Sequence, residues 1–583
     1  MENSKSYLKK LSRRNFLRNS VIAAAGATLI PAVLTSCDDD FVEGPFVAEG
    51  EAGTYGFLQG VASFDPSQDG VILWSRYTPA SNETFIEPII VDVATDASFT
   101  SVVASQSVHI DVSSDLTVIV DLSNLNSNTK YYYRFRNERS GAVSVTGETR
   151  TLPAVGEASE IKLAVVSCAN YQVGLFNTYG AVAESDADVV IHLGDYIYEY
   201  EIGGYGTNDL TTSLSRQHDP AGEIVSLDEY RTRYRQYRSD EQLQKAHQLK
   251  PFICVWDDHE VTNDAYKDGA ENHQADEGDF ETRKLAAIQA WHEYLPARVS
   301  DNSEIYRSFD FAGIVKLMML DTRIVGRDKQ LDYLNYFTPT GLDAAAFAAD
   351  WQNPTRTLLG TKQLSWLTTE LASSTANWNV LGTQVLMGKY MIPAELLIIT
   401  AQIAAVGLTP ELLTQYNALV TELATIKTRI LLGDPTVTAE ERARVETVLP
   451  YNLDAWDGYP VEREAVYAAA NGKKLIAVAG DTHNAWHSNL TDISKAKVGA
   501  EFATASVSSP GFEALFGTDP TVLAGFEQAN NLLIDDLQYS NASKRGFLLV
   551  SFTASAASAD WRFIETLATV NTTTSSGNTV VEN

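Results

Sequence analysis

The sequence predicts an α/β protein in which an immunoglobulin- or fibronectin-like β-sandwich precedes a larger α/β sandwich domain. Segments within 45–150, such as GVILWSRY and LTVIVDL, look like short strands separated by turn residues, at the roughly ten-residue spacing typical of β-sandwiches. Residues 152–160 read as a linker. From residue 160 to 568, apolar runs alternate with helical stretches such as FETRKLAAIQAWHEYL, which predicts an α/β domain.

The amino terminus carries the features of an export signal. Arg13 and Arg14 precede the small, apolar stretch VIAAAGATLIPAVL, a pattern typical of twin-arginine signals, so we expect export through that machinery. The stretch ends in Leu-Thr-Ser-Cys at Cys37, which is either a lipidation site or a chance cysteine in an ordinary signal peptide. Residues 1–37 are therefore predicted to direct the protein to the periplasm or cell surface, with a lipid anchor at the membrane.

The composition excludes one class of partner. Forty-four Lys and Arg stand against 75 Asp and Glu, for a net charge of −31, which argues against a binding patch for a nucleic-acid backbone. Such acidity suits divalent cations, and it also suits simple solubility. Of three cysteines, Cys37 belongs to the signal; Cys254 lies within an apolar run, whereas Cys168 stands at a strand end beside polar residues.

Two segments late in the chain have a distinct texture. Residues 393–447 contain apolar residues at helical spacing and are predicted to form a helical insertion. The tail at 569–583 is low in complexity and rich in Thr, Ser and Asn, so we expect it to be disordered.

Six apolar runs end in, or just before, a side chain able to bind a metal. They are IKLAVVSC at Cys168, ADVVIHLGD at Asp195, PFICVWDD at Asp258, IVKLMMLD at Asp321, WNVLGTQ at Gln384 and KLIAVAGDTH at His483. Runs rich in Val, Ile and Leu without alternation predict strands buried on both faces of a sheet. Because ligands bind at the carboxyl ends of such strands, we expect one edge of a central sheet to bind cations.

The residues around these strand ends have chemistry in common. Asp195 supplies a carboxylate that two metals can share, and Tyr198 is either a phenolate ligand or a buried aromatic with a hydrogen-bonded hydroxyl. The block WDDHE, which contains Asp258, is either a buried cation site or a solvated acidic loop. Arg323 is the usual type of group for a bidentate phosphate clamp, although the neighbouring Asp321 fits a structural ion pair equally well.

Taken together and in order, these blocks resemble the PhoD-type alkaline phosphatases and phosphodiesterases of the calcineurin-like metallophosphoesterase superfamily. The matching blocks are GVASFDPSQDGVILWSR, SC, GDYIY, WDDHE, LDTR, DGYPVERE and GDTH. The common superfamily pattern has more histidines at four of its metal-binding positions. In this sequence those four positions hold Cys168, Asp258 with His259, Gln384, and Asp481 with His483.

The resemblance implies a metallophosphoesterase α/β sandwich with an iron–calcium centre. It assigns a ferric ion to Cys168, Asp195 and Tyr198, with His483, since thiolate and phenolate suit iron. It assigns calcium to oxygen ligands: Asp195, Asp258, Asn263 and Asp481, with Gln384 a weaker candidate.

The implied activity is metal-assisted hydrolysis of a phosphate ester. In this hypothesis His259 protonates the leaving group or stabilises the transition state, and Arg323 orients the phosphate. Two alternatives remain open. One is a phospholipase D-like diesterase, and the other is a non-catalytic surface lipoprotein that metals stabilise.

Overall fold

The computed structural model describes residues 55–80, 87–338 and 341–583. The predicted export signal at 1–37, including Cys37, lies outside the described residues.

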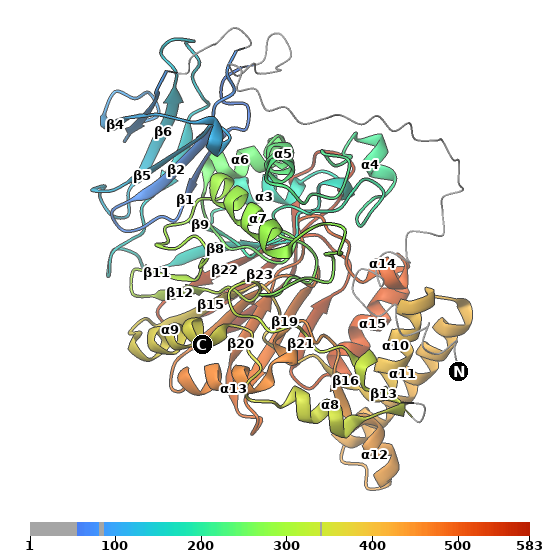
Figure 1. The fold of residues 1–583 in the computed structure, drawn as a ribbon. Coiled ribbons are helices and arrows are strands. Elements are labelled where there is room, and N and C mark those ends of the chain that lie inside the picture. The colour runs from blue at the N-terminus through green and yellow to red at the C-terminus, as the bar shows by residue number, and fades with distance from the viewer. Residues whose placement is uncertain (1–54, 81–86, 339–340) are drawn as a thin grey trace, which may run out of the picture.

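Two large β-sheets form the centre of the molecule (Figure 1). The nine-stranded sheet contains, in order, β24 (Thr574–Glu582), β23 (Ala557–Ile564), β22 (Gly546–Phe552), β8 (Ile161–Val166), β9 (Val189–His192), β10 (Pro251–Cys254), β1 (Val61–Phe64), β2 (Val71–Arg76) and β5 (Thr117–Leu122). The seven-stranded sheet contains β11 (Arg307–Phe311), β12 (Val315–Met319), β15 (Trp378–Thr383), β18 (Leu475–Ala479), β20 (Lys497–Ala503), β19 (Ala485–Thr491) and β21 (Leu537–Asn541).

The six apolar runs all form strands, but they divide between two sheets rather than sharing one. β8, β9 and β10 are parallel neighbours in the first sheet, and β12, β15 and β18 are parallel neighbours in the second. A hydrophobic core that includes Val165, Val190, Val380 and Val478 joins the sheets. The prediction of a single sheet was wrong because an apolar run shows that both faces of a strand are buried, and this does not reveal which strands pair.

The amino-terminal region forms a β-sandwich whose two layers have different neighbours. One layer is a four-stranded sheet of β4 (Val102–Val108), β3 (Ile89–Ala94), β6 (Lys130–Arg136) and β7 (Gly147–Arg150). It packs on β1, β2 and β5 through a core that includes Val71, Val91 and Tyr133. Because β1 also pairs in parallel with β10, the other layer continues directly into the nine-stranded sheet.

Helices cover the outer faces of both sheets. The first group consists of α3 (Asn177–Glu184), α4 (Asp209–Ser213), α5 (Leu227–Tyr237), α6 (Glu241–Leu249) and α7 (Phe280–Tyr294). The second consists of α8 (Ala344–Trp351), α9 (Gly360–Ser373), α13 (Pro460–Ala469), α14 (Glu513–Phe516) and α15 (Pro520–Leu533). Side chains of α3, α5, α6 and α7 enter the core shared by the sheets, whereas α9, α13 and α15 contribute to a second core.

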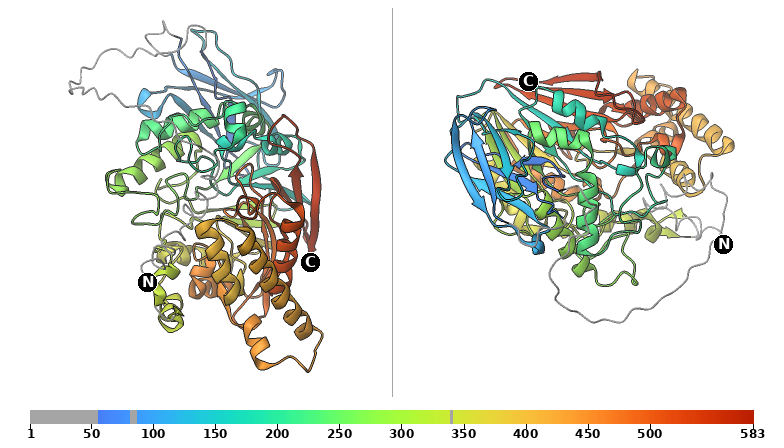
Figure 2. Two further views of the ribbon diagram at one scale, coloured as in Figure 1. Left: turned by 90° about the vertical axis from the view of Figure 1, so that its right-hand side faces the viewer. Right: turned by 90° about the horizontal axis from the view of Figure 1, so that it is seen from above.

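The predicted helical insertion contains three helices: α10 (Ala394–Val406), α11 (Pro410–Leu431) and α12 (Ala439–Glu446). A two-stranded sheet of β16 (Met391–Pro393) and β17 (Val448–Pro450) closes its base. Figures 1 and 2 show these helices at the end of the molecule opposite the amino-terminal sandwich. Within the residues that the structure describes, none of the helices is both long and apolar enough to span a membrane.

The carboxyl-terminal tail is ordered, contrary to the prediction of disorder for 569–583. β24 pairs antiparallel with β23 along its length, and Lys497 Nζ lies 2.8 Å from Glu582 Oε1. The red strands at the rim of the molecule in Figure 2 include this pair. The tail is rich in Thr and Val, which favour strands, and it pairs with the edge of β23 that β22 leaves free. Low complexity concealed this strand because its stability comes from pairing with β23, which composition does not show.

Candidate metal centre

Four of the predicted ligands adopt a left-handed backbone just after their strands. The φ angles are 62° for Cys168, 54° for Asp195, 65° for Asp481 and 63° for His483. Such values are uncommon for residues other than glycine and are found at functional sites where the surrounding structure enforces them. These turns place side chains from both sheets at one common edge.

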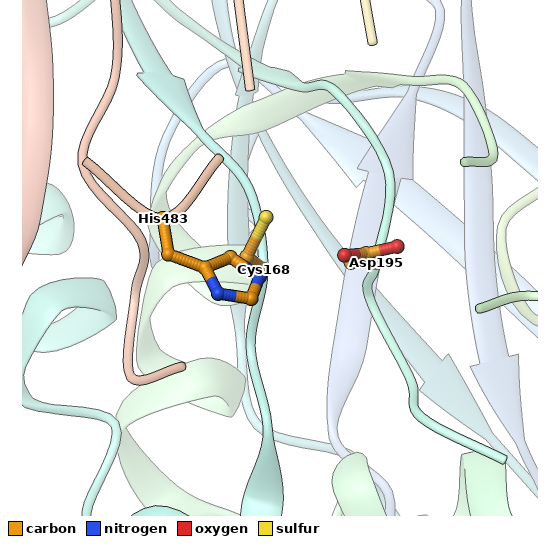
Figure 3. Close-up of side chains that lie close together, drawn as sticks. All are labelled: Cys168, Asp195 and His483. Carbon is orange, nitrogen blue, oxygen red and sulfur yellow. The ribbon is translucent and has the colours of Figure 1, made fainter. Parts of the chain in front are cut away.

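The first group of donor atoms combines a thiol, a carboxylate and an imidazole. Ligand atoms of Cys168, Asp195 and His483 lie within 4.8 Å of one another, and all three residues are buried (Figure 3). The hydroxyl of Tyr198 donates to Oδ2 of Asp195 at 3.0 Å and lies 3.2 Å from Nε2 of His483. The four residues that the resemblance assigned to iron therefore converge.

Contacts of His483 fix which of its nitrogens faces this group. Nδ1 lies 2.7 Å from the carbonyl oxygen of Pro510. Because a carbonyl can only accept, Nδ1 carries the proton, and Nε2 keeps its lone pair on the side of Tyr198. The ring of Tyr205, which sequence analysis missed, stacks on the imidazole at a centroid distance of 6.1 Å.

Two further groups are connected to the first by shared residues. Asp195, Asp258 and His259 form one, and Asp257, Asp258 and Asp481 form the other, with the same 4.8 Å separation limit and complete burial. Asp195 links the first and second groups, and Asp258 links the second and third. Buried carboxylates at this density need compensating positive charge. The donor set therefore fits a cluster of cations bridged by shared carboxylates.

His259 is held by a buried carboxylate. Its Nδ1 lies 2.7 Å from Oε2 of Glu199, which leaves Nε2 available. Burial alone lowers the pKa of this imidazole. The negative charges of Asp195, Glu199 and Asp258 outweigh burial and raise the pKa to about 10.

The Cys168 thiol and the neighbouring Tyr198 phenol are protonated when no cation is nearby. Burial raises the pKa of the Cys168 thiol well above its usual range, and the charge of Asp195 adds to this effect. Burial also raises the pKa of Tyr198, again with a contribution from Asp195. A bound cation reverses this preference because it stabilises the anionic ligand.

Arg323 lies among buried carboxylates. The side chain is completely buried, and each of its three nitrogens contacts a carboxylate. Nε bonds to Asp257, one terminal nitrogen lies 2.7 Å from Asp454, and the other lies 2.9 Å from Asp481. The guanidinium thus offsets carboxylate charge beneath the cluster, and its role in orienting the phosphate stays a prediction.

Two other candidates, Asp321 and Gln384, form hydrogen bonds that connect loops. Oδ2 of Asp321 accepts a hydrogen bond from the Trp256 indole at 2.8 Å. Gln384 joins two strand ends, since its amide contacts Thr322 and Leu320. Asn263, by contrast, is buried in the loop after Asp258, where its backbone NH donates to Glu199 at 2.9 Å and its side-chain amide donates to Glu271 at 3.3 Å. Cys168 and Cys254 are both free thiols.

Several supporting carboxylates escaped the sequence analysis. Glu260 accepts from the backbone NH groups of Asp195 and Asp257, at 2.9 and 2.7 Å, and so ties together two ligand loops. Glu260 belongs to the block WDDHE, so the sequence showed its charge but not its hydrogen bonds to these two loops. Glu199 follows GDYIY directly, and that position was the only signal. Nothing in the sequence around Asp454 indicated its contact with Arg323.

A cavity of about 560 Å³ opens beside the cluster. Asp481 and His483 form part of its wall, and residues of α10 and of the loop at 449–454 form other parts. A substrate can therefore reach the ligand groups from this side.

Comparisons with known proteins agree with this geometry. A family model described as PhoD-like phosphatase matches residues 163–561, and one described as PhoD-like phosphatase, N-terminal domain, matches residues 45–153. Alkaline phosphatase D of Bacillus subtilis (strain 168) is 33% identical over 476 residues, which cover 79% of this chain and 70% of that protein. A solved structure described as "Structure of PhoD" superimposes with a TM-score of 0.70 and 29% identity over 91% of each chain. The resemblance and the fold class are thus confirmed: this chain belongs to the PhoD-like phosphatase family and is a phosphate-ester hydrolase.

Proposed function

We propose that the protein is an exported, alkaline phosphatase-like enzyme that hydrolyses phosphate monoesters, phosphodiesters or both with an iron–calcium cluster. The observation that carries this proposal is the sharing of Asp195 and Asp258 among three adjacent groups of buried donors. Shared carboxylates of this kind are what a cluster of neighbouring cations requires.

The donor chemistry supports a different metal at each end of the cluster. The group of Cys168, Asp195 and His483, with the Tyr198 hydroxyl beside it, offers the soft sulfur and phenol oxygen that favour iron. The group of Asp257, Asp258 and Asp481 offers oxygen alone, which favours calcium. Asn263, in the loop after Asp258, is the proposed additional calcium ligand.

The chain's own residues prepare the site for the reaction. When bound, the cations activate water and stabilise the negative charge of a phosphoryl group. Glu199 holds His259 through Nδ1, so that Nε2 can donate a proton to the departing alcohol oxygen. Arg323 holds Asp257 and Asp481 in place.

Elemental analysis of the purified protein, combined with its visible spectrum, tests the metal assignment. We expect iron and calcium together with a thiolate- or tyrosinate-to-iron charge-transfer band. Asp195→Asn should lose metal and hydrolysis of p-nitrophenyl phosphate. Asp92→Asn is the matched control, because Asp92 is also buried but is paired with Arg134 and Arg136 in the distant β-sandwich. Normal turnover by Asp195→Asn would refute the site.

Two comparisons decide among the alternative activities. Rates on p-nitrophenyl phosphate and bis-p-nitrophenyl phosphate distinguish a monoesterase from a diesterase of the phospholipase D type. A preparation with full iron and calcium that hydrolyses neither ester would favour a non-catalytic lipoprotein.

The proposals of export and anchoring rest on the sequence motifs at 1–37. Arg13→Lys combined with Arg14→Lys should retain the protein inside the cell if the twin-arginine machinery exports it. Cys37→Ser should release it from membranes if Cys37 is lipidated. Fractionation of cells followed by immunoblotting measures both outcomes.

A further inference from the structure

We propose that the cavity beside the cluster binds an apolar, uncharged group in the alcohol of the phosphate ester, so that the enzyme prefers alkyl or aryl phosphates to polar ones. This inference rests on the proposed function, because it places the reacting phosphate at the shared carboxylates. It adds which part of the substrate the rest of the cavity recognises.

The cavity and the cluster share a wall. Asp481 and His483, which belong to the ligand groups, line the cavity together with Pro510, Gly511 and Phe512. A phosphate held at the cluster would therefore direct its ester oxygen toward this space. The volume of about 560 Å³ falls within the range of roughly 300–1,000 Å³ that is usual for small-molecule sites.

Helix α10 forms an apolar side of the cavity. Its residues Ile399 and Ile403 are buried in the second core, while Leu397, Ile398 and Ala401 line the cavity. The helix is thus apolar on two faces, although a surface helix normally has one polar face. Ile398 is 53% exposed, a degree of exposure that an apolar ligand would relieve.

Other parts of the cavity lining are also apolar. Tyr333, Tyr451 and Leu453 contribute to it, as do Phe337 of β13 (Phe337–Thr338) and Leu342 of β14 (Gly341–Leu342). Aromatic and aliphatic walls of this kind stabilise a ligand by removing apolar surface from water.

The charges of the lining disfavour anionic alcohols. Lys329 is the single Lys or Arg among the described lining residues, which include the carboxylates Asp264, Glu271 and Asp332. The charges of the two other lining carboxylates, Asp454 and Asp481, are offset by Arg323. An alcohol with further phosphates, such as a nucleotide, would meet repulsion there. A neutral alkyl chain or ring avoids this repulsion and gains contact with the apolar walls.

A series of n-alkyl phosphates from ethyl to octyl tests the inference, with phosphate release as the readout. Burial of each methylene group should raise kcat/KM by about two- to fourfold, so the octyl ester, with six more methylene groups, should exceed the ethyl ester by at least about sixtyfold. Glucose 6-phosphate, whose alcohol has the size of a hexyl chain but is polar, should react no faster than the ethyl ester. A flat series would overturn the inference and assign the cavity to another occupant, such as a protein segment.

Substitutions on α10 provide the structural arm of the test. Ile398→Asn should reduce the octyl-to-ethyl ratio of kcat/KM by about tenfold, because it places an amide against the chain. Val406→Asn is the matched control: Val406 is 44% exposed on the same helix and lies outside the cavity lining, so the ratio should not change. Equal ratios in both variants would contradict the role of α10.

Binding of alkylphosphonates separates this inference from the proposed function. Their carbon–phosphorus bond is not an ester, so calorimetry on the metal-loaded protein reports binding without turnover. Affinity that rises with chain length, but with no hydrolysis of any alkyl phosphate, would support the cavity and refute the catalytic proposal. Hydrolysis of all esters at one rate, with affinity independent of chain length, would support the catalytic proposal and refute the role of the cavity.

Discussion

Oε2 of Glu199 lies 2.7 Å from Nδ1 of His259, and both side chains are buried. Glu199→Gln keeps the size of the side chain but removes the charge that orients and stabilises the imidazolium. We expect kcat to fall by about 10- to 100-fold, the usual effect of losing a carboxylate partner of a functional histidine. KM should change little. Glu199 also accepts a hydrogen bond from the backbone of Asn263, the proposed calcium ligand, and Gln keeps an acceptor at this place, so we expect the calcium content to be retained. Steady-state kinetics and elemental analysis measure this, and a kcat within twofold of wild type would contradict it.

The two buried cysteines provide a matched pair of substitutions. Cys168→Ser replaces a sulfur that lies with Asp195 and His483, so bound iron should fall by about tenfold or more. The charge-transfer band should weaken in parallel. Cys254→Ser changes an equally free and buried thiol in β10 and should leave the iron content unchanged. If both variants retain iron, Cys168 is not a ligand.

Arg323→Gln tests whether this arginine offsets buried charge or clamps phosphate. Its removal leaves Asp257 and Asp481 without its guanidinium, while Asp454 keeps its contact with Arg327, so unfolding free energy should fall by about 3–5 kcal/mol. Urea denaturation with a chelator present measures the loss. A variant of wild-type stability whose only change is a higher KM would instead support the prediction that Arg323 orients the phosphate.

Glu501 should make stability depend on pH. Burial, followed in effect by the charge of Asp457, raises the pKa of Glu501 to about 7 even though Met387 and Gly388 donate backbone hydrogen bonds to it. An acid with a raised pKa in the folded state stabilises the protein at low pH, and this contribution is lost as pH rises through 7. Relative to Glu501→Gln, the wild type should therefore lose about 2–3 kcal/mol between pH 5 and 8. Urea unfolding at the two pH values measures this. A difference in unfolding free energy between wild type and Glu501→Gln that is the same at pH 5 and pH 8 would refute the assignment.

Sequence reasoning succeeded where the signal was local. Apolar runs ended at Cys168, Asp195 and His483. Polar side chains are costly inside a strand that is buried on both faces, so they are expected at its end. The left-handed backbone at these positions was not predictable, because it depends on hydrogen bonds such as that from Asp195 to Glu260, which come from another part of the chain.

What the sequence did not reveal is pairing between residues. Arg323 contacts Asp454, which is distant in the sequence, and the order of β24 comes from pairing with the preceding strand β23. Charge type and composition describe a residue but not its neighbours. Glu199 shows the intermediate case, since its position after GDYIY gave a place near the cluster without giving its contact with His259.

The division of the ligands between two sheets has a mechanical consequence. Asp195 follows a strand of the nine-stranded sheet, and Asp481 follows a strand of the seven-stranded sheet. Cations bound between these two loops would therefore link the two sheets. Ligands that bind only the folded state add their binding free energy to stability. A chelator would then act on this enzyme as a denaturant as well as an inhibitor, and heat resistance would follow the supply of metal.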